Sequence, residues 1–386
     1  MKILCSTQEF LSALQLVSRA IGSQQALPIL GNILLEAKGD KCIASATDLE
    51  LSIVTSFDAR IESEGSITVP AKAILNFAQY NTDAEVMLEA VEGTQLRCTS
   101  KHAKTLIAGE AASEYPSIAG IEKQTTFSLE ASPLLQALHL VTFAAARTTL
   151  RPVLSGVYLR SMDGMLVLVA TDSYRLSEYR LPTEGGSEQI ACIIPVKILD
   201  EVRMVLGASA KSDKKAKKEE TTPENTASGH RVAVSLSKQQ IELRVGDTRL
   251  LSRLIDGKFP NYEQIIPKDE TVKVHLSLDE LTTAVKRMHY FAKEMNNNLT
   301  FHFAAGQSKI STPQTPIGKD EAELQAEITG GEGKIALSSS YLLDFLGHMT
   351  GEGINLTMTD SQHPAVFRIP GEERFLHLIM PLRMQE

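Results

Sequence analysis

The chain of 386 residues contains no tryptophan, and aromatic residues make up only 5% of it. It also has no uninterrupted run of about 18 or more apolar residues, the length that a membrane-spanning helix needs. Near the start, the short apolar stretch Ile3–Cys5 gives way at once to polar residues, which is too little for a signal peptide. These absences predict an ordinary globular protein of the cytoplasm.

Cysteine is scarce as well. The four cysteines, Cys5, Cys42, Cys98 and Cys192, lie far apart and include no CxxC pair. This spacing favours reduced, buried thiols over a disulfide framework or a zinc site. The nine histidines show no metal-ligand spacing either. We therefore expect no metal and no cofactor.

Catalytic motifs are missing: the sequence has no GxSxG, no HExxH and no GxGxxG after a strand pattern. Gly330–Lys334 resembles a phosphate loop, but its spacing differs and Ile335 follows the lysine where Ser or Thr should stand. Asp48 and Asp172 could act as an acid pair, although their equivalent places in a repeat favour a structural role. We predict no catalytic residues and no enzyme.

The chain repeats itself at an interval of 125 residues. Pro70 and Pro195 each stand just before a helical pattern, and they are 125 residues apart (195 − 70). The amphipathic patterns of residues 6–21 and 131–146 start at the same offset (131 − 6). An offset shared by two separate elements indicates a duplicated domain.

Fainter helical patterns at residues 276–292 and 337–349 predict a third copy. We place the three domains at residues 1–122, 123–267 and 268–386. Segment 207–230 has almost no large apolar side chains, so burial cannot offset the entropy of ordering it. We interpret it as a low-complexity surface insertion in the second domain, a loop rather than an additional electrostatic contact.

Hairpin signals define the fold class. Gly39-Asp40 separates two strand patterns in the first domain, and Asp163-Gly164 does so in the second. Each domain thus has two helical patterns and several short strand patterns joined by tight turns. This order predicts an α+β fold of mostly antiparallel sheets with the helices on one face.

Charge is distributed unevenly. The net charge of −8 excludes a protein that is basic all over, but local positive surfaces remain possible. Lys72, Arg147 and Lys197 belong to helical patterns, whereas many acidic residues belong to strand patterns. The helices could therefore line a positive surface while the sheets face solvent with acidic side chains. The alternative is an ordinary solvated face.

Five segments resemble the bacterial beta sliding clamp family, the beta subunits of DNA polymerase III that act as replicative processivity factors: Leu27–Asn32, Ala46–Glu50, Ala170–Leu176, Phe259–Tyr262 and Met380–Arg383. The resemblance covers the whole chain. It implies three tandem repeats of the DNA clamp fold and a head-to-tail homodimer that closes a ring around duplex DNA, with helices lining the hole.

The resemblance implies a non-catalytic clamp that binds DNA independently of sequence and tethers the replicative polymerase catalytic subunit. Its other partners would be a clamp-loader ATPase and further clamp-motif proteins, and it would lie in the cytoplasm, on the nucleoid during replication. The alternative is a clamp-fold scaffold with little DNA affinity. By resemblance, the residues near DNA are Gln24, Lys72, Arg147, Arg151 and Lys197.

The resemblance also implies a hydrophobic pocket for client peptides between the second and third domains, lined by Leu154, Thr171, Ser173, Tyr174, Arg175, Leu176, Pro260, Ile265, Tyr341, Leu378, Met380, Pro381, Leu382 and Arg383. The dimer contacts would be Lys104, Thr105, Leu106 and Ile107, facing Tyr290 and Phe291 of the partner. Ser173-Tyr174, Gln264 and the terminal Met384–Glu386 depart from the family pattern, which leaves the client peptide preference open.

Overall fold

The computed structural model describes residues 1–22, 27–92, 94–148, 150–183, 189–219 and 231–384, with residues 209–219 described by their backbone alone. These residues form two compact units, one of Met1–Ala131 with Met204–Leu254 and one of Ser132–Arg203 with Ile255–Glu386. The predicted α+β class is confirmed. The predicted domain boundaries at residues 122 and 267 stay a prediction, and Gln24 lies outside the described residues.

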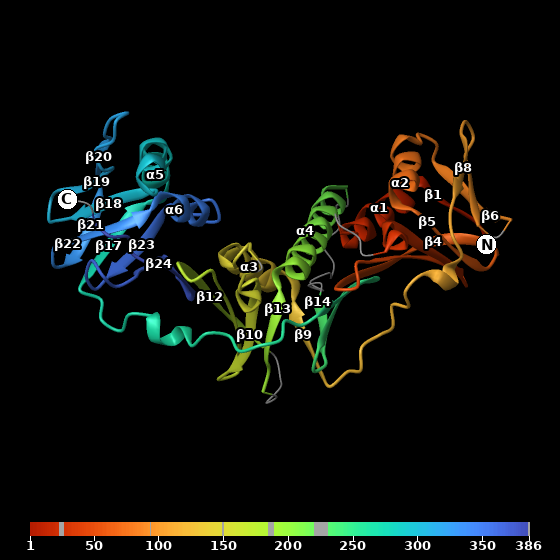
Figure 1. The fold of residues 1–386 in the computed structure, drawn as a ribbon, viewed down its shortest axis with the longest axis horizontal. Helices are drawn as coiled ribbons and strands as arrows, with labels where there is room; N and C mark the ends of the chain where they lie inside the picture. Colours follow the sequence, from red (N-terminus) through yellow and green to blue (C-terminus); the bar gives the residue numbers. More distant parts are fainter. Residues whose placement is uncertain (23–26, 93, 149, 184–188, 220–230, 385–386) are drawn as a thin grey trace. The chain divides into compact units, whose positions relative to one another are not determined.

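The first unit contains two helices that pack on each other, α1 (Thr7–Val17) and α2 (Ala71–Tyr80). Ser6 caps α1 because its hydroxyl accepts a hydrogen bond from the backbone N–H of Glu9 at 3.5 Å. Pro70 stands immediately before α2, where its missing N–H does no harm. Figure 1 shows both helices on the same side of the strands of this unit.

One large sheet holds the first unit together. Its main path runs in the order β8 (Lys104–Ala108), β7 (Gln95–Thr99), β6 (Glu85–Val91), β1 (Lys2–Ser6), β4 (Leu51–Ser63), β16 (Thr248–Arg253), β15 (Gln240–Val245), β14 (Arg231–Leu236) and β9 (Thr125–Glu130). A branch carries β2 (Asn32–Lys38), β3 (Lys41–Thr47) and β5 (Gly65–Pro70). Strands of the first and second sequence repeats therefore pair directly, β4 with β16, with Ile53 opposite Leu250.

The second unit has two sheets. The larger runs in the order β13 (Ala191–Pro195), β10 (Gly156–Met162), β11 (Met165–Thr171), β12 (Arg175–Pro182), β25 (Glu372–Ile379), β24 (Ala365–Ile369), β23 (Gly353–Met358), β17 (Val272–Ser277) and β21 (Ala326–Gly330). The smaller runs β20 (Glu321–Leu324), β19 (Ser308–Ser311), β18 (Asn298–Phe303) and β22 (Gly333–Ser338). Its described helices are α3 (Ala131–Val141), the first part of α4 (Val196–Glu219), α5 (Leu278–Ala292) and α6 (Ser339–Leu346), and α5 packs on α6.

Both predicted hairpins are present. Gly39 has φ +67° in the turn between β2 and β3, and Asp163 and Gly164 have φ +51° and +76° between β10 and β11. At Asp163-Gly164 the positive φ of both central residues defines a type I′ turn, whose twist matches that of the flanking strands; in the first hairpin only Gly39 has a positive φ. The period-2 pattern and the turn residues were therefore sufficient to find these strands.

The Thr-Asp pairs that end the two hairpins build the same turn twice. The Asp48 carboxylate accepts hydrogen bonds from the N–H groups of Glu50 and Leu51, at 3.1 and 2.7 Å. One repeat later, the Asp172 carboxylate accepts from Tyr174 and Arg175, at 2.9 and 3.1 Å. The predicted structural role of both aspartates is therefore what the structure shows.

Segment 207–230 differs from the expectation. Helix α4 runs from Val196 to Glu219, so the first half of this segment is helical and its interpretation as a loop was wrong there. Alanine and lysine, which supply eight of the thirteen residues 207–219, are good helix formers and need no core contact to be compatible with a helix. The lack of large apolar residues excluded burial but not helicity. Residues 220–230 lie outside the described part of the chain.

Three of the four cysteines, Cys5, Cys42 and Cys98, are buried, and all four are free. Burial raises the pKa of the Cys5 and Cys98 thiols to about 12, which keeps them protonated. Within the described chain, no helix combines the length and hydropathy needed to cross a membrane. The described residues also contain no group of three or more His, Cys, Asp or Glu arranged for a metal ion.

Candidate functional site

The second and third sequence repeats meet where β12 pairs with β25. Leu176 lies opposite Leu378 in this ladder, and Arg175 lies opposite Ile379. Leu154, Leu176 and Leu378 are buried in one apolar cluster, against which Met380 packs. The structure thus gathers four of the predicted pocket residues, although Leu378 and Met380 come more than 200 residues after Leu154 and Leu176 (378 − 176).

Arg175 organises the polar part of this junction. Its side chain is only 5% exposed and its guanidinium bonds to Asp172 at 3.1 Å, to Asp344 at 2.5 Å and to the carbonyl of Phe143 at 2.8 Å. The guanidinium carbon also lies 5.0 Å from the ring centroid of Tyr341, within cation–π range. The planar fork of arginine can serve all these partners at once. Burial and the Asp172 carboxylate raise the pKa of Tyr341.

Apolar and aromatic side chains lie at the surface beside Arg175. Tyr174 is 60% exposed and stacks on Tyr341, with 6.2 Å between ring centroids. The backbone N–H of Met380 donates to the carbonyl of Tyr174 at 2.8 Å, which holds the terminal segment beside the two rings. We call Tyr174, Arg175, Tyr341 and Met380 the junction surface.

The remaining predicted pocket residues surround this surface on several elements. Ser173 has φ +81°, and its N–H donates to the Thr171 hydroxyl at 3.1 Å. Past Met380, the N–H of Leu382 donates to Ala336, and the carbonyl of Arg383 accepts from Asn298. These bonds fix the terminal segment against β22 and β18. Pro381 is half-buried between them.

The segment between β16 and β17 holds two predicted pocket residues, and their exposure differs from that of their neighbours. Pro260 is exposed and Ile265 is 38% exposed, whereas their neighbours Phe259 and Tyr262 are buried in the cluster with Leu154. Tyr262 was not among the predicted pocket residues. The signal in the sequence was its place in Phe259–Tyr262, one of the five segments that carry the family resemblance.

A buried polar network anchors Tyr262. Its hydroxyl donates to the carboxylate of Glu178 at 2.7 Å and accepts from Arg160 at 3.0 Å. Arg180 bonds to the other oxygen of Glu178, which is only 2% exposed. Burial and the hydrogen bond to Glu178 raise the pKa of Tyr262. This network holds the segment around Tyr262 against β10 and β12.

The first unit offers an internal comparison. In its corresponding Thr-Asp turn, Glu50 takes the place of Tyr174. The carbonyl of Glu50 accepts a hydrogen bond from the N–H of Arg253 at 3.2 Å, as the carbonyl of Tyr174 does from the N–H of Met380. A charged pair, 4.0 Å between side chains, thus stands where the second unit has an aromatic and a methionine side chain. At these equivalent positions the second unit carries two apolar side chains and the first unit a charged pair, next to which Leu49 is 45% exposed.

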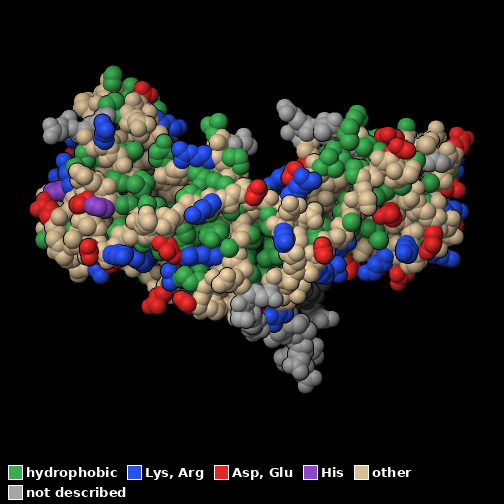
Figure 2. All heavy atoms as spheres, turned by 60° about the horizontal axis from the view of Figure 1, so that its bottom comes forward, with side chains coloured by type: hydrophobic (Ala, Val, Ile, Leu, Met, Phe, Trp, Pro, Cys, Tyr) green, Lys and Arg blue, Asp and Glu red, His purple; other side chains and the backbone are tan. Residues whose placement is uncertain are grey.

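The predicted DNA-binding residues within the described chain are two lysines at helix starts and two arginines after α3. Lys72 and Lys197 are exposed and each is the second residue of its helix, α2 and α4. Arg147 is exposed after α3, whereas Arg151 donates to the hydroxyl of Ser173 at 3.1 Å. Arg151 therefore contacts a residue of the predicted peptide pocket. On the face drawn in Figure 2, basic side chains lie among acidic ones.

The predicted dimer contacts lie at an open sheet edge and at a helix end. Strand β8, which contains Lys104–Ile107, is the last strand of its sheet, and Leu106 on it is 55% exposed. Tyr290 near the end of α5 is 68% exposed and lies edge-on to Phe291. Their pairing across two chains stays a prediction.

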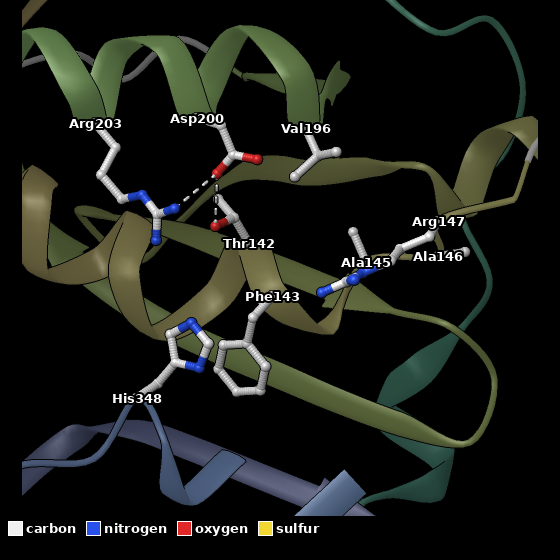
Figure 3. Close-up of a pocket in the computed structure, with 9 residues that line it drawn as sticks. All are labelled: Thr142, Phe143, Ala145, Ala146, Arg147, Val196, Asp200, Arg203 and His348. Atoms are coloured by element: carbon white, nitrogen blue, oxygen red, sulfur yellow. Dashed lines mark hydrogen bonds and ion pairs between the residues drawn. The ribbon is translucent and has the colours of Figure 1, made fainter. Parts of the chain in front are cut away.

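The second unit also contains a hollow of about 230 Å³, drawn in Figure 3. It lies between the end of α3, the start of α4 and the end of α6. The lining residues are Thr142, Phe143, Ala145, Ala146, Arg147, Val196, Asp200, Arg203 and His348. Apart from Arg147, these residues were not predicted to form a site, because they belong to three separate segments and form no motif.

Comparisons with known proteins agree across the whole chain. Family models of the DNA polymerase III beta subunit match in tandem: the N-terminal domain at residues 1–119, the central domain at 128–215 and the C-terminal domain at 263–383. The beta sliding clamp of Synechocystis sp. is 29% identical, with 100% of both chains covered. That of Pseudomonas putida is 28% identical, with 98% of both covered.

Among solved structures, the DNA polymerase sliding clamp from Bacillus subtilis superposes with a TM-score of 0.89 at 25% identity, over 100% of both chains. The repeat, the antiparallel sheets and these similarities confirm the resemblance found in the sequence. The chain belongs to the bacterial beta sliding clamp family, the beta subunits of DNA polymerase III.

Proposed function

We propose that this chain is a non-catalytic sliding clamp that closes a homodimeric ring around duplex DNA and confers processivity on a replicative polymerase. The observation that carries the proposal is the tandem match of three beta-subunit domains along one chain. The proposed place of action is the cytoplasm, on replicating DNA. The alternative is a clamp-fold scaffold with little DNA affinity, and the DNA-retention experiment below can detect it.

The contact with DNA must be weak and independent of sequence, because a ring that holds DNA by topology has to slide. Exposed lysines at helix starts suit this task, since they meet phosphates without contacting base edges. Lys72 and Lys197 occupy the same position in two repeats, which supports a shared role. Arg147 supplies a further exposed cation.

The junction surface supports the proposed binding of client peptides. Tyr174, Tyr341 and Met380 offer apolar area beside a buried arginine. Sites of this kind use apolar side chains for affinity and a few polar groups to orient an extended peptide. The charged Glu50–Arg253 pair at the equivalent place in the first unit explains why one client site per chain is proposed.

Ring closure requires contact between the first domain of one chain and the third domain of another. The open edge of β8 with its exposed Leu106 is a surface that natural proteins rarely leave uncovered. A head-to-tail contact of this kind closes after two subunits when the geometry permits. We expect Leu106→Glu to give a monomer by solution mass, whereas Leu27→Glu, also at an exposed leucine, should leave the dimer intact.

DNA retention tests the clamp function directly. Wild-type protein, loaded by a clamp loader onto a nicked circular duplex, should stay on the circle and be lost when the circle is cut. The triple variant Lys72→Gln, Arg147→Gln, Lys197→Gln should be retained for a shorter time at low salt. Equal loss from circular and linear DNA would favour the scaffold function instead.

A peptide assay tests the client site. Tyr174→Ala and Tyr341→Ala should each weaken binding of an extended hydrophobic client peptide by about ten-fold, because aromatic anchors dominate such interfaces. Tyr80→Ala serves as the matched control, since Tyr80 is 73% exposed on α2. Unchanged affinity in both junction variants, with dimer mass preserved, would show that the client site lies elsewhere.

A further inference from the structure

Five aromatic and imidazole rings of the second unit contact one another in a row. They come from α3, the short helix Thr142–Ala144, α6 with the turn after it, and β25. Neighbouring ring centroids lie 4.9, 4.3, 5.3 and 4.5 Å apart in the order His139, His348, Phe143, His377 and Phe345. We call these rings the ring column, and Figure 3 shows two of them, Phe143 and His348. Because three of the five rings are histidines, protons can alter this packing.

The ring column is connected to the junction surface through α6 and Arg175. The Arg175 guanidinium donates to the carbonyl of Phe143 at 2.8 Å, and its carbon lies 5.5 Å from the Phe143 ring centroid. On α6, Phe345 follows Tyr341 by four residues, so the two rings share one face of the helix. The place of Tyr341 beside Tyr174, with 6.2 Å between ring centroids, therefore depends on the packing of the column.

His377 cannot satisfy the second N–H of a protonated ring. The residue is 0% exposed, and its Nδ1 lies 2.8 Å from the hydroxyl of Ser177, in a hydrogen bond. Within the described chain, its Nε2 has no hydrogen-bond partner. A protonated imidazole has two N–H donors, so one donor would stay unsatisfied in the interior. Burial, the charge of Arg175 and His348 hold the pKa of His377 well below its ordinary value of 6.5.

The groups around the ring column offer no replacement partner. Strand β24 contributes Phe367, which does not titrate and whose ring centroid lies 6.4 Å from that of His377. The charged and titratable groups on the other elements are Asp172 before β12, Arg175 and Tyr179 on β12, Tyr341, Asp344 and His348 on α6 and the turn after it, His139 on α3 and Arg203 on α4. Within the described chain, both carboxylates bond to Arg175 and neither bonds to a ring of the column. Burial, His348 and Arg203 also lower the pKa of His139.

We propose that the ring column is an acid-sensitive switch of the client site: when its histidines take up protons, the contact between β12 and α6 opens and Tyr174 separates from Tyr341. The proposal rests on the proposed client binding and adds a control to it. His377 is a positioning residue in this scheme, because it acts on a bound peptide through α6 and Arg175. The switch is local, since it concerns one contact within the second unit.

The direction of the pH effect follows from the two states of His377. In the open junction the imidazole is hydrated and titrates at its ordinary value of 6.5, whereas in the closed junction its pKa is lower. The closed junction is therefore fully favoured above pH 6.5, and this advantage is lost as the pH falls below 6.5. Between pH 7.5 and 5.5, one such histidine raises the equilibrium constant for opening about ten-fold. A client peptide binds only the closed junction, so protons and peptide oppose each other.

The test measures hydrogen exchange of the full-length chain at pH 7.5 and 5.5, corrected for the intrinsic exchange rate at each pH. In the wild type, the opening constant of amides in β12, β25 and α6 should rise about ten-fold or more, without an equal rise in β18 and β19. The double variant Ser177→Ala, His377→Phe replaces both hydrogen-bond partners by apolar groups and keeps a ring. About ten-fold of the rise should disappear in it. The matched control His363→Gln, at an exposed histidine of the same unit, should show the wild-type rise.

A second measurement connects the opening to the client site. An end-blocked hydrophobic peptide without histidine or carboxylate, added at about 100 times its dissociation constant, should lower the opening constant of the wild type at pH 5.5 about 100-fold. Peptide that binds at pH 7.5 but leaves the opening unchanged would overturn the switch and leave the proposed function standing. An equal rise in β18 and β19, or in the double variant, would overturn it as well.

A further variant keeps the test decisive if the double variant does not fold by circular dichroism. In His139→Gln the side-chain amide can still donate to the carbonyl of His348, as His139 does at 3.1 Å. The rise in this variant should be smaller than in the wild type, and a rise of wild-type size would again overturn the switch. Absence of peptide binding to the wild type at pH 7.5 would instead contradict the proposed client site.

Discussion

Replacing Arg175 should destabilise the second unit strongly. In Arg175→Ala, Asp172 and Asp344 lose their shared cation and the Phe143 carbonyl loses its donor. Breaking a buried charge pair on one side costs about 3–5 kcal/mol. Because the Asp172 and Asp344 side chains remain 15% and 31% exposed, water can reach them, and we expect a loss of about 3 kcal/mol, the lower end of that range.

Urea unfolding followed by far-ultraviolet circular dichroism measures this loss, since the chain has no tryptophan to report by fluorescence. Hydrogen exchange in β12 and β25 should show the protection lost locally. In an Asp344→Asn background the cost of Arg175→Ala should fall by about 1–2 kcal/mol, because one charged hydrogen bond is already gone. A loss below about 1 kcal/mol, or the same cost in both backgrounds, would refute the reasoning.

Two further substitutions test the polar networks. Tyr262→Phe should destabilise the second unit by about 2 kcal/mol in the same urea assay, because the buried Glu178 loses a donor; an unchanged midpoint would contradict the network. In the first unit, hydrogen bonds from Ser100 and His102 lower the pKa of Asp83 from 3.8 to about 2. A depressed carboxyl pKa stabilises the fold above pH 3.8, and this contribution disappears as pH falls through about 2. Asp83→Asn should therefore melt below the wild type at pH 6 and match it near pH 2, whereas a constant gap at all pH values would exclude this linkage.

Local chemistry made much of the fold predictable. The turn residues Asp163-Gly164 and the strand alternation around them specify a hairpin within some fifteen residues, and the structure contains it. Asp48 and Asp172 lie 124 residues apart (172 − 48), within one residue of the repeat interval, and this spacing identified them as equivalent before any contact was known. Helix α4 was misjudged after residue 207, because apolar content was used as the criterion where helix propensity decides.

The candidate site was predictable only where the family resemblance supplied it. The residues around Arg175 come from segments near 143, 172, 175 and 344, and no spacing in the sequence indicates that one guanidinium joins them. The hollow is a second example of such convergence. The packing of α3, α4 and α6 brings together Arg147, Asp200, Arg203 and His348. Long-range convergence depends on the tertiary fold, so a pattern search along the chain does not find it.

The pairing of strands across sequence repeats has a consequence for the protein while it is being synthesised. The first four residues of β4, Leu51–Val54, have no partner on one side until β16 is synthesised, 197 residues later (250 − 53). Strand β12 likewise waits 202 residues for β25 (378 − 176). At translation rates of about 5–20 residues per second, each edge stays open for roughly 10–40 s. A nascent chain therefore presents a templating edge twice during its synthesis, and stalled or truncated products should aggregate through β4 or β12 rather than through the helices.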